Sequence, residues 1–300
     1  MHASIEQLAQ PERPYYRRFV AIQSAFMKLL CVLSTICILA ILALVTTYLL
    51  VKGANYLSWD IFTELPIPPG MVGAPGGLKN ALVGTGILVA LASAIGIPLG
   101  VLAGVYLSEY SAGSWLGSPA RFIADVLTGV PSIVVGILGY ELVVVPMGHF
   151  NGYAGALALA FIMTPLVART TEEMLRLVPN SYREASIALG ATKNRTILHV
   201  VLPAATGSII TGVMLAIARI AGETAPLLFT ALGSRLLTLD PSQQFPSLTV
   251  QIFVYATGPY RDEQNLAWAG MLLLIGSVFV LNLALRLTAH HLQRNGPTRA

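Results

Sequence analysis

The sequence predicts an all-α protein that crosses a membrane about six times. Of its 300 residues, 55% are hydrophobic and only 11% are charged, and the mean hydropathy is +0.71. A typical soluble domain carries about 25% charged residues. The apolar residues also form continuous runs of the length that a membrane-spanning helix needs, about 20 residues. We expect helices because a backbone in lipid must satisfy its own hydrogen bonds and these runs do not alternate with polar residues.

Six apolar runs are candidates for the membrane spans. Polar segments, or segments rich in glycine and proline, separate them and mark the turns. The runs cover residues 25–51, 80–107, 122–146, 153–168, 206–232 and 266–287. The fourth run is the shortest.

The basic residues predict the orientation of these spans. Thirteen of the 18 Lys and Arg residues fall on one side, four fall on the other, and Arg219 lies within a span. Because basic residues concentrate in cytoplasmic loops, we expect both termini and the long polar connection after the fourth span in the cytoplasm. The net charge of +4 then reflects topology and attraction to membrane lipids. No basic patch with interleaved aromatic residues indicates nucleic-acid binding.

The predicted domain organisation has three parts. Residues 1–24 are a cytoplasmic segment, 25–290 a transmembrane domain that contains a cytoplasmic loop at 169–203, and 291–300 a cytoplasmic tail. The first segment is too long and too acidic for the start of a signal peptide, so we expect an uncleaved anchor. Cys31 and Cys37 lie in the first span, where we expect buried, reduced thiols and neither a disulfide nor a metal site.

Two connections on the outer side are expected to differ in character. The segment 53–79 is rich in proline and glycine, which indicates a loop with turns. The segment 232–266 mixes apolar and turn residues, so it either dips back toward the membrane or meets a soluble partner.

The second span carries a row of small residues at four-residue spacing, Gly96, Gly100 and Gly104. Such rows let two helix backbones approach closely in lipid. We therefore favour a packing role for them over a ligand-binding role. Pro98 in the same span favours a bend.

The third span has a charged mouth and an internal weak point. Arg121 and Asp125 are four residues apart, so they share a helix face and are expected to pair. Gly129 and Pro131 weaken the helix further along. A kinked packing helix and a flexible gate both fit this pattern.

The fourth span is followed by charged residues. Thr170 stands three residues before Glu173, which is the spacing of a helix cap. Arg169, Glu172, Glu173 and Arg176 are typical of a solvated helix face.

Residues 181–203 predict a helical hairpin outside the membrane. Ser181 and Glu184 have the spacing of a capping box. Gly190 is placed to end the first helix in a left-handed conformation. Thr192 is expected to start a second helix that runs toward Pro203, a residue tolerated in a first helical turn.

The fifth span holds the candidate substrate-binding residues. Arg219 lies about 20 Å along this span at about 1.5 Å per residue, which places it near the middle of the membrane. Glu223, four residues on, is expected on the same face. A charge at that depth must be paired or must face water. A buried pair that only fixes the helix rotation is one interpretation. The other is that Arg219 binds an oxyanion in a cavity opened by Gly222 and Pro226 while Glu223 balances its charge.

The hairpin resembles a known motif. Glu184, Ala185 and Ser186, followed by Gly190 and then by a Val-Val-Leu-Pro run that ends at Leu202 and Pro203, resemble the EAA loop of ABC importer permeases. That family has Ala at the position of Ser186 and Ile at the position of Val200. The resemblance implies the type I (MetI-like) permease architecture, with these residues as the coupling helix that docks on an ATP-hydrolysing subunit.

Three longer segments indicate which kind of ABC importer permease the chain resembles. ARIAGETAPLL in the fifth span, ADVLTGVPSIVVG in the third and SLTVQIFVYATGPY in the last loop are similar to the A-type permeases of bacterial phosphate-specific ABC importers. Membership would imply phosphate uptake by alternating access, with Arg219 and Glu223 at the family's charged positions. It would also imply a second homologous permease, two ATP-binding subunits and an external phosphate-binding protein.

Catalytic motifs are absent from the sequence. It contains no GxxxxGK[ST], so ATP and its magnesium are expected on a partner subunit and no cofactor on this chain. It contains no HExxH or other pattern of catalytic or metal-binding residues. An importer permease for another solute, such as sulfate or molybdate, is the nearest alternative. A membrane enzyme that acts on lipid phosphates is a further alternative. Such an enzyme needs a nucleophile or a metal cluster near the membrane interface, and the sequence indicates neither.

Overall fold

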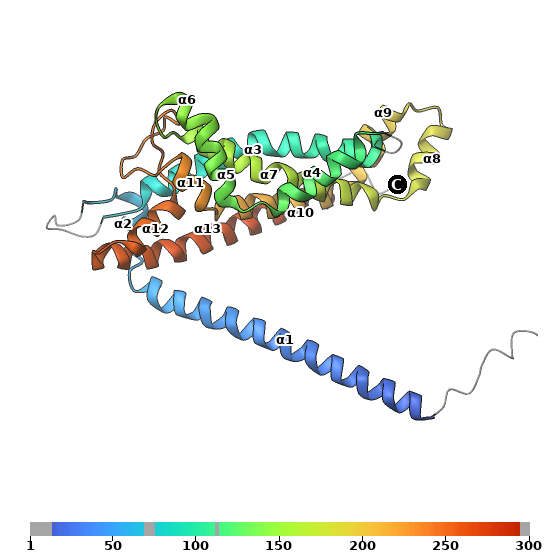
Figure 1. The fold of residues 1–300 in the computed structure, drawn as a ribbon, viewed down its shortest axis with the longest axis horizontal. Helices are drawn as coiled ribbons and strands as arrows, with labels where there is room; N and C mark the ends of the chain where they lie inside the picture. Colours follow the sequence, from blue (N-terminus) through green and yellow to red (C-terminus); the bar gives the residue numbers. More distant parts are fainter. Residues whose placement is uncertain (1–13, 69–75, 112–113, 295–300) are drawn as a thin grey trace, which may run out of the picture. The chain divides into compact units, whose positions relative to one another are not determined.

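The structure is a computed structural model that describes residues 14–68, 76–111 and 114–294 (Figure 1). Residues 1–13 and 295–300, at the two predicted cytoplasmic ends, lie outside the described residues, and so do the side chains of Arg17, Arg18, Arg286 and Arg294. These four arginines, and Arg13 and Arg299 in the two ends, are among the thirteen basic residues counted for the orientation.

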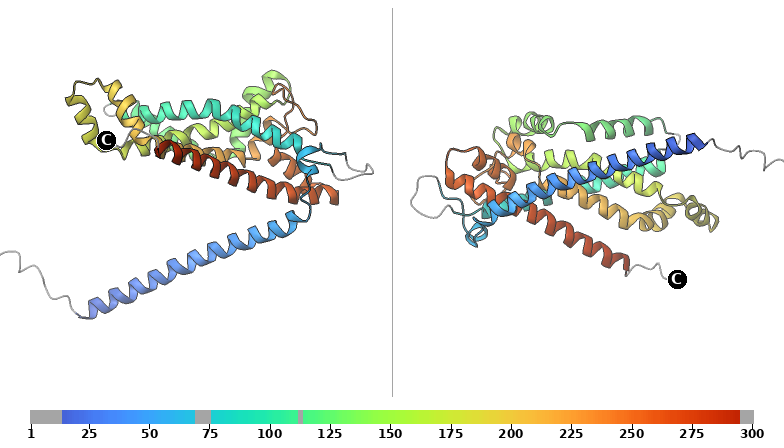
Figure 2. Two further views of the ribbon diagram at one scale, coloured as in Figure 1. Left: turned by 180° about the vertical axis from the view of Figure 1, so that it is seen from behind. Right: turned by 90° about the horizontal axis from the view of Figure 1, so that it is seen from below.

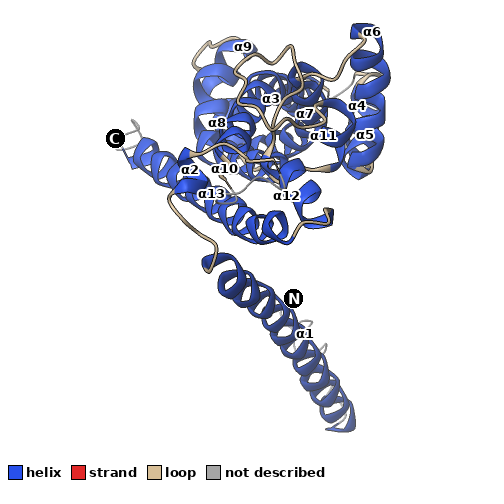
Figure 3. Ribbon diagram, turned by 90° about the vertical axis from the view of Figure 1, so that its left-hand side faces the viewer, coloured by secondary structure: helices blue, strands red, loops and turns tan. Residues whose placement is uncertain are grey.

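The described chain is helical throughout and has no strand longer than an isolated bridge (Figure 3). It divides into two units, 1–52 and 53–300, which are described separately. The first unit consists of helix α1 (Pro14–Ala54), an apolar helix of 41 residues. Cys31 and Cys37 are free but exposed on this helix, so the expectation of buried thiols is wrong. The reason is that a single helix cannot enclose its own side chains.

The second unit holds the remaining elements, and Figure 2 shows it from two further sides. Three of these elements (η) are π-helical. In chain order they are α2 (Asp60–Thr63), α3 (Lys79–Val105), η2 (Tyr106–Tyr110), α4 (Gly117–Gly129), α5 (Ser132–Gly139), η3 (Tyr140–Val144), α6 (Val145–Met147), α7 (Gly152–Arg176), α8 (Asn180–Ala188), α9 (Lys193–Thr196), η4 (Ile197–Val201), α10 (Leu202–Ala221), α11 (Ala225–Thr230), α12 (Leu248–Thr257) and α13 (Arg261–Arg294).

Five described helices are long and apolar enough to cross a membrane, and a sixth span results if α4 and the helices after it count as one broken span. This agrees with the six predicted spans. The predicted fourth span was too short, because α7 continues without a break to Arg176. Thr170 therefore caps no helix, and its hydroxyl donates instead to the carbonyl of Leu166 at 3.0 Å within α7.

Helix α7 is the centre of the second unit, and α3, α4, α5, α10 and α11 all pack against it. The closest approach is to α3, and the glycine row of α3 makes it possible. A Cβ atom on Gly100 would lie 2.6 Å from Cβ of Val167, and one on Gly104 would lie 2.6 Å from the carbonyl oxygen of Ala168. The predicted packing role of this row is confirmed, since any larger residue would separate the two backbones.

The third span breaks where the sequence is weakest. Helix α4 ends at Gly129, Val130 and Pro131 are extended, and the segment from Ser132 to Met147 is bent by 101° from α4. Helix α5 then packs on α11, with Gly136 against the backbone of Pro226. The kink is confirmed, whereas the flexibility of a gate stays a prediction.

The fifth span differs from its predicted extent at both ends. Helices α9, η4 and α10 are continuous, so one helical segment runs from Lys193 to Ala221. It ends there because Gly222 and Glu223 leave the helix before the short α11 begins at Ala225. The predicted continuation to residue 232 is wrong, and the weakening by Gly222 and Pro226 is its physical cause.

Replacing one glycine of the α3–α7 contact tests its packing role. We expect Gly100→Ala to lower the stability by about 1–3 kcal/mol, because the new methyl group overlaps Val167. Gly86→Ala on the same helix is the matched control, since a Cβ there meets no atom within 4 Å. Thermal unfolding of both purified variants in detergent gives the comparison. Equal melting temperatures would contradict the packing role.

Candidate functional site

The predicted hairpin is present and joins α8 to α9. Figure 1 shows it at one end of the second unit, next to the label α8. Glu184 and Ala185 are exposed on α8, and the hydroxyl of Ser186 lies 2.9 Å from that of Thr196, which ties the two arms together. Gly190 has φ of +85°, so its predicted left-handed conformation is confirmed.

The predicted capping box at the start of α8 is wrong. The helix begins at Asn180, directly after Pro179, and Ser181 lies within its first turn. The guanidinium of Arg183 donates to the carbonyls of Leu175 (2.9 Å) and Val178 (2.7 Å), at the end of α7. These contacts bring the chain directly into α8, so the helix starts one residue before the predicted cap.

The second arm of the hairpin continues without a break into a helix that is long and apolar enough to cross a membrane. Helix α9 begins after Thr192, as predicted, although the Thr192 side chain caps nothing. Leu202 and Pro203 are the first two residues of α10 and follow η4 directly, so they lie inside one continuous helical segment. The second arm of the hairpin and Arg219 are therefore parts of one helical segment.

A clamp that the sequence did not reveal holds both arms of the hairpin. On η2, Glu109 forms an ion pair of 2.6 Å with Arg183 of α8, and both side chains are largely buried. Its neighbour Tyr110 donates to Asn194 of α9 at 2.7 Å, and its ring lies 4.6 Å from Nζ of Lys193. Glu109 and Arg183 are 74 residues apart in the chain, so no spacing rule links them.

Next to this clamp lies a buried carboxylate, Glu172, with 1% of its side chain exposed. Arg121 (2.7 Å), Arg169 (2.9 Å) and Arg176 (2.6 Å) all contact it. The expectation of a solvated face is wrong for Glu172, because α4 packs over this part of α7.

The predicted pair of Arg121 with Asp125 is also wrong. Arg121 contacts Glu172 and donates to the carbonyl of Leu107 at 3.1 Å, whereas Asp125 pairs with Arg169 at 2.8 Å. Both residues share a face of α4, as predicted, but that face meets α7. Arg121 and Asp125 therefore each pair with an oppositely charged residue of α7 and not with each other.

Arg219 and Glu223 do lie together, at the end of α10. Nε of Arg219 is 3.7 Å from Oε1 of Glu223, an ion pair too long for a good hydrogen bond. They are not on one helix face as predicted, because Glu223 lies beyond the end of the helix. The backbone after Gly222 turns it back, and Thr249 of α12 donates to its carbonyl at 2.9 Å.

The two side chains differ in exposure, with 51% for Arg219 and 16% for Glu223. The loose pair leaves most donors of the guanidinium available to an anion. Both interpretations of this pair stay predictions.

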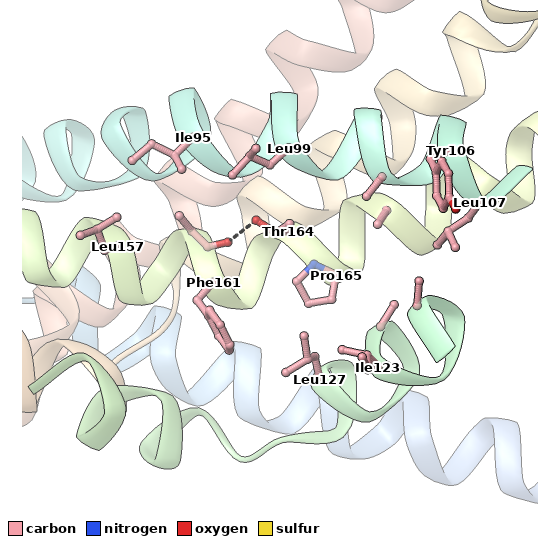
Figure 4. Close-up of a pocket in the computed structure, with 15 residues that line it drawn as sticks. Ile95, Leu99, Tyr106, Leu107, Ile123, Leu127, Leu157, Phe161, Thr164 and Pro165 are labelled. Atoms are coloured by element: carbon pink, nitrogen blue, oxygen red, sulfur yellow. Dashed lines mark hydrogen bonds between the residues drawn. The ribbon is translucent and has the colours of Figure 1, made fainter. Parts of the chain in front are cut away.

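A large cavity of about 420 Å³ lies elsewhere, between α3, α4 and α7 (Figure 4). Its lining includes Ile95, Leu99, Phe161 and Pro165, and no charged side chain is among the lining residues. The hydroxyl of Thr164 is already bonded to the carbonyl of Ala160 at 2.8 Å. This cavity cannot compensate the charge of an oxyanion and is therefore not its binding site.

Among the residues that the structure describes, no three His, Cys, Asp or Glu side chains gather as they would around a metal ion. The charged groups instead form ion pairs, at the hairpin end and at the end of α10.

Comparisons with known proteins agree on the class of the chain. Residues 96–295 match the family model of the binding-protein-dependent transport system inner membrane component. The phosphate transport system permease protein PstA of Yersinia pestis is 50% identical over 235 residues, which are 78% of this chain and 79% of that protein.

Two solved structures share the fold. One is the MetNI methionine ABC transporter in an inward-facing conformation, with a TM-score of 0.57 at 22% identity, covering 72% of this chain and 94% of that chain. The other is a bacterial alginate ABC transporter, with a TM-score of 0.62 at 14% identity, covering 93% and 97%. The predicted MetI-like architecture is confirmed by these ABC importer folds.

The clamp on the hairpin can be tested by removing one charge. We expect Glu109→Gln to destabilise the protein by about 3 kcal/mol, because Arg183 keeps a charge that is no longer paired. Amide hydrogen exchange in α8 should rise more than in α10. Glu173→Gln is the control, since that carboxylate is exposed and lies 4.0 Å from Arg169. Unchanged exchange in α8 would refute the clamp.

Proposed function

The chain belongs to the family of binding-protein-dependent transport system inner membrane components, and we propose that it is the permease subunit through which an ATP-driven importer moves inorganic phosphate into the cell. The observation that carries the choice of phosphate is the 50% identity to a phosphate permease, which covers nearly four fifths of both chains. The exposed guanidinium of Arg219 supports this choice chemically, since its fork of donors suits a tetrahedral oxyanion.

The family membership fixes several coarser properties. The chain is a multi-pass protein of the inner membrane, and it is a transport subunit rather than an enzyme. Its system includes ATP-binding and substrate-binding partners. The finer composition is part of our proposal: a second homologous permease, two ATP-binding subunits and an external phosphate-binding protein.

We assign the docking of the ATP-binding subunit to the hairpin. Its tip carries Ile187 and Leu189, which are 56% and 89% exposed. Exposed apolar side chains of this kind mark an interaction surface. Together with Glu184, Ala185, Ser186, Gly190, Leu202 and Pro203, they form the proposed coupling surface. The orientation follows, because ATP is cytoplasmic: the hairpin and both termini face the cytoplasm.

The continuity of α9, η4 and α10 supports a direct route for coupling. From Lys193 to Arg219 this helical segment spans about 40 Å at about 1.5 Å per residue. A displacement of the hairpin by the ATP-binding subunits therefore moves Arg219 without an intervening joint. Alternating access then exposes Arg219 first to the outside and later to the cytoplasm.

The charges at the end of α10 suit such a passage. A phosphate dianion cannot enter an apolar pore without a counter-charge. Arg219 supplies that charge, and Glu223 neutralises it between passages, so that the empty site carries no isolated cation. The loose contact lets the anion replace Glu223 at little cost.

Replacing Arg219 tests the proposed function. We expect Arg219→Gln to lower radiolabelled phosphate uptake by at least about thirtyfold, since losing a charged partner costs about 2 kcal/mol or more. The cells used should lack their own high-affinity phosphate system. Arg261→Gln, an exposed arginine at the start of α13, is the control and should transport normally.

Assembly with the partner subunits must be verified by co-purification. Undiminished uptake by an assembled Arg219→Gln complex would contradict the role of Arg219. Competition by arsenate but not by sulfate is expected; the reverse would favour a permease for another oxyanion.

A further inference from the structure

Helix α12 begins beside the break that ends α10. The carbonyl of Glu223 accepts a hydrogen bond of 2.9 Å from the hydroxyl of Thr249, a side chain that is 4% exposed. Thr249 is the second residue of α12 and lies 26 residues after Glu223 in the chain. The proposed contact of Arg219 with an anion has so far assigned no role to this threonine.

The hydrogen bond from Thr249 joins two separate segments. Threonines in helices commonly donate to a carbonyl of their own helix, as Thr257 of α12 does to Phe253 at 2.8 Å. Thr249 instead donates to Glu223, which lies between α10 and α11, where the ladder of helix hydrogen bonds is interrupted. The N–H of Glu223 still donates to the carbonyl of Ile220 at 3.2 Å. The backbone of Glu223 is therefore held from both sides.

The first turn of α12 is itself firmly held by α3. The N–H of Leu248 donates to the hydroxyl of Thr85 at 2.8 Å, and the side chain of Gln251 accepts from Nδ2 of Asn80 at 3.1 Å. Leu248, Gln251 and Asn80 are all buried. Because α3 packs closely on the central helix α7, α12 ties Glu223 to the stiff part of the unit.

The side chain of Glu223 stays at a distance from its partner. Hydrogen-bonded pairs of a guanidinium with a carboxylate are usually about 2.7–2.9 Å long. Glu109 and Arg183 approach to 2.6 Å, whereas Glu223 and Arg219 are 3.7 Å apart. The longer separation indicates that the backbone of Glu223 restrains its side chain.

We propose that Thr249 is a positioning residue that prevents Glu223 from closing on Arg219 and so keeps the guanidinium open to the transported anion. This inference rests on the proposed function. Glu223 competes with phosphate for Arg219, and it competes more strongly at a shorter separation, because the attraction between two charges grows as they approach. Without the hydroxyl of Thr249, the backbone after Gly222 is released and the pair shortens.

Protection of Arg219 by phosphate measures this competition. The assembled importer, without the external binding protein, is treated with the arginine-directed reagent phenylglyoxal over a series of inorganic phosphate concentrations at constant ionic strength. Mass spectrometry reports the modification of Arg219. Thr249→Val keeps the shape of the side chain and removes the hydroxyl, so we expect it to need about tenfold more phosphate for half protection. An unchanged half-protecting concentration would overturn the proposal.

Two variants separate positioning from a general effect on the helix. Thr249→Ser keeps the donor and should behave as the wild type does. Thr257→Val makes the same substitution in the same helix, at a hydroxyl that is bonded only within α12, and should also leave the protection unchanged. An equal shift in Thr257→Val would mean that any change in α12 has this effect, which would contradict a specific role of Thr249.

A double variant tests whether Thr249 acts through Glu223. In Glu223→Gln the competing charge is absent, so adding Thr249→Val should change the half-protecting concentration by less than about twofold. An undiminished effect in that background would refute the proposed route. Wild-type importer in which phosphate does not protect Arg219 would refute the proposed function, whereas normal protection that Thr249→Val leaves unaltered would refute this inference alone.

A measurement on the unaltered chain applies even if Thr249→Val does not assemble. Electron cryomicroscopy of the phosphate-free importer should show the hydroxyl of Thr249 on the carbonyl of Glu223, with the carboxylate of Glu223 beyond hydrogen-bond distance of Arg219. A pair closed to hydrogen-bond distance while Thr249 is in place would rule out the positioning role.

Discussion

A charge in a membrane protein must find a partner, and this constraint explains how the charged residues of the second unit are arranged. An unpaired guanidinium or carboxylate is too costly to leave in an apolar environment. Glu172 is therefore enclosed by three arginines, and Glu109 is bound to Arg183. These pairs are short, and both carboxylates are buried. The pair of Arg219 with Glu223 is longer, at 3.7 Å, which suits the proposed displacement of Glu223 by an anion.

The helices around these pairs divide into a close-packed part and a broken part. Helices α3 and α7 meet through glycines with almost no space between their backbones, so they form a stiff centre. The third and fifth spans are each interrupted, at Val130 and at Gly222. The short helices that follow these breaks, α5 and α11, pack on each other. The second break comes three residues after Arg219, so the chain leaves the helix directly beside this side chain.

Much of the fold could be predicted from the sequence because its signals are local. Apolar runs gave the spans, the spacing of Gly96, Gly100 and Gly104 gave a helix contact, and Gly190 gave the turn of the hairpin. Predictions from residue spacing failed where a residue distant in the chain provides a better contact than a near one. Arg121 prefers Glu172 on another helix to Asp125 on its own, and Thr170 lies within a helix that tertiary packing extends.

The candidate site was predictable in its residues but not in its geometry. Arg219 and Glu223 are identifiable as charges within an apolar run. The exact end of α10 at Ala221 is not, because Gly222 and Pro226 indicate only a weak point in the helix. The position of Glu223 also depends on Thr249 of α12, a residue distant in the chain. Glu109 was missed for a related reason, since its partner Arg183 lies 74 residues away in the chain.

The central claim is that the guanidinium of Arg219, carried on the helical segment that begins at the hairpin, binds the transported anion. Electron cryomicroscopy of the assembled importer with phosphate bound tests it most directly. The account predicts density for the anion within hydrogen-bond distance of Arg219, with Glu223 displaced from it and the hairpin seated on an ATP-binding subunit. Phosphate bound in a passage that Arg219 does not reach, or a hairpin facing away from the ATP-binding subunits, would contradict it.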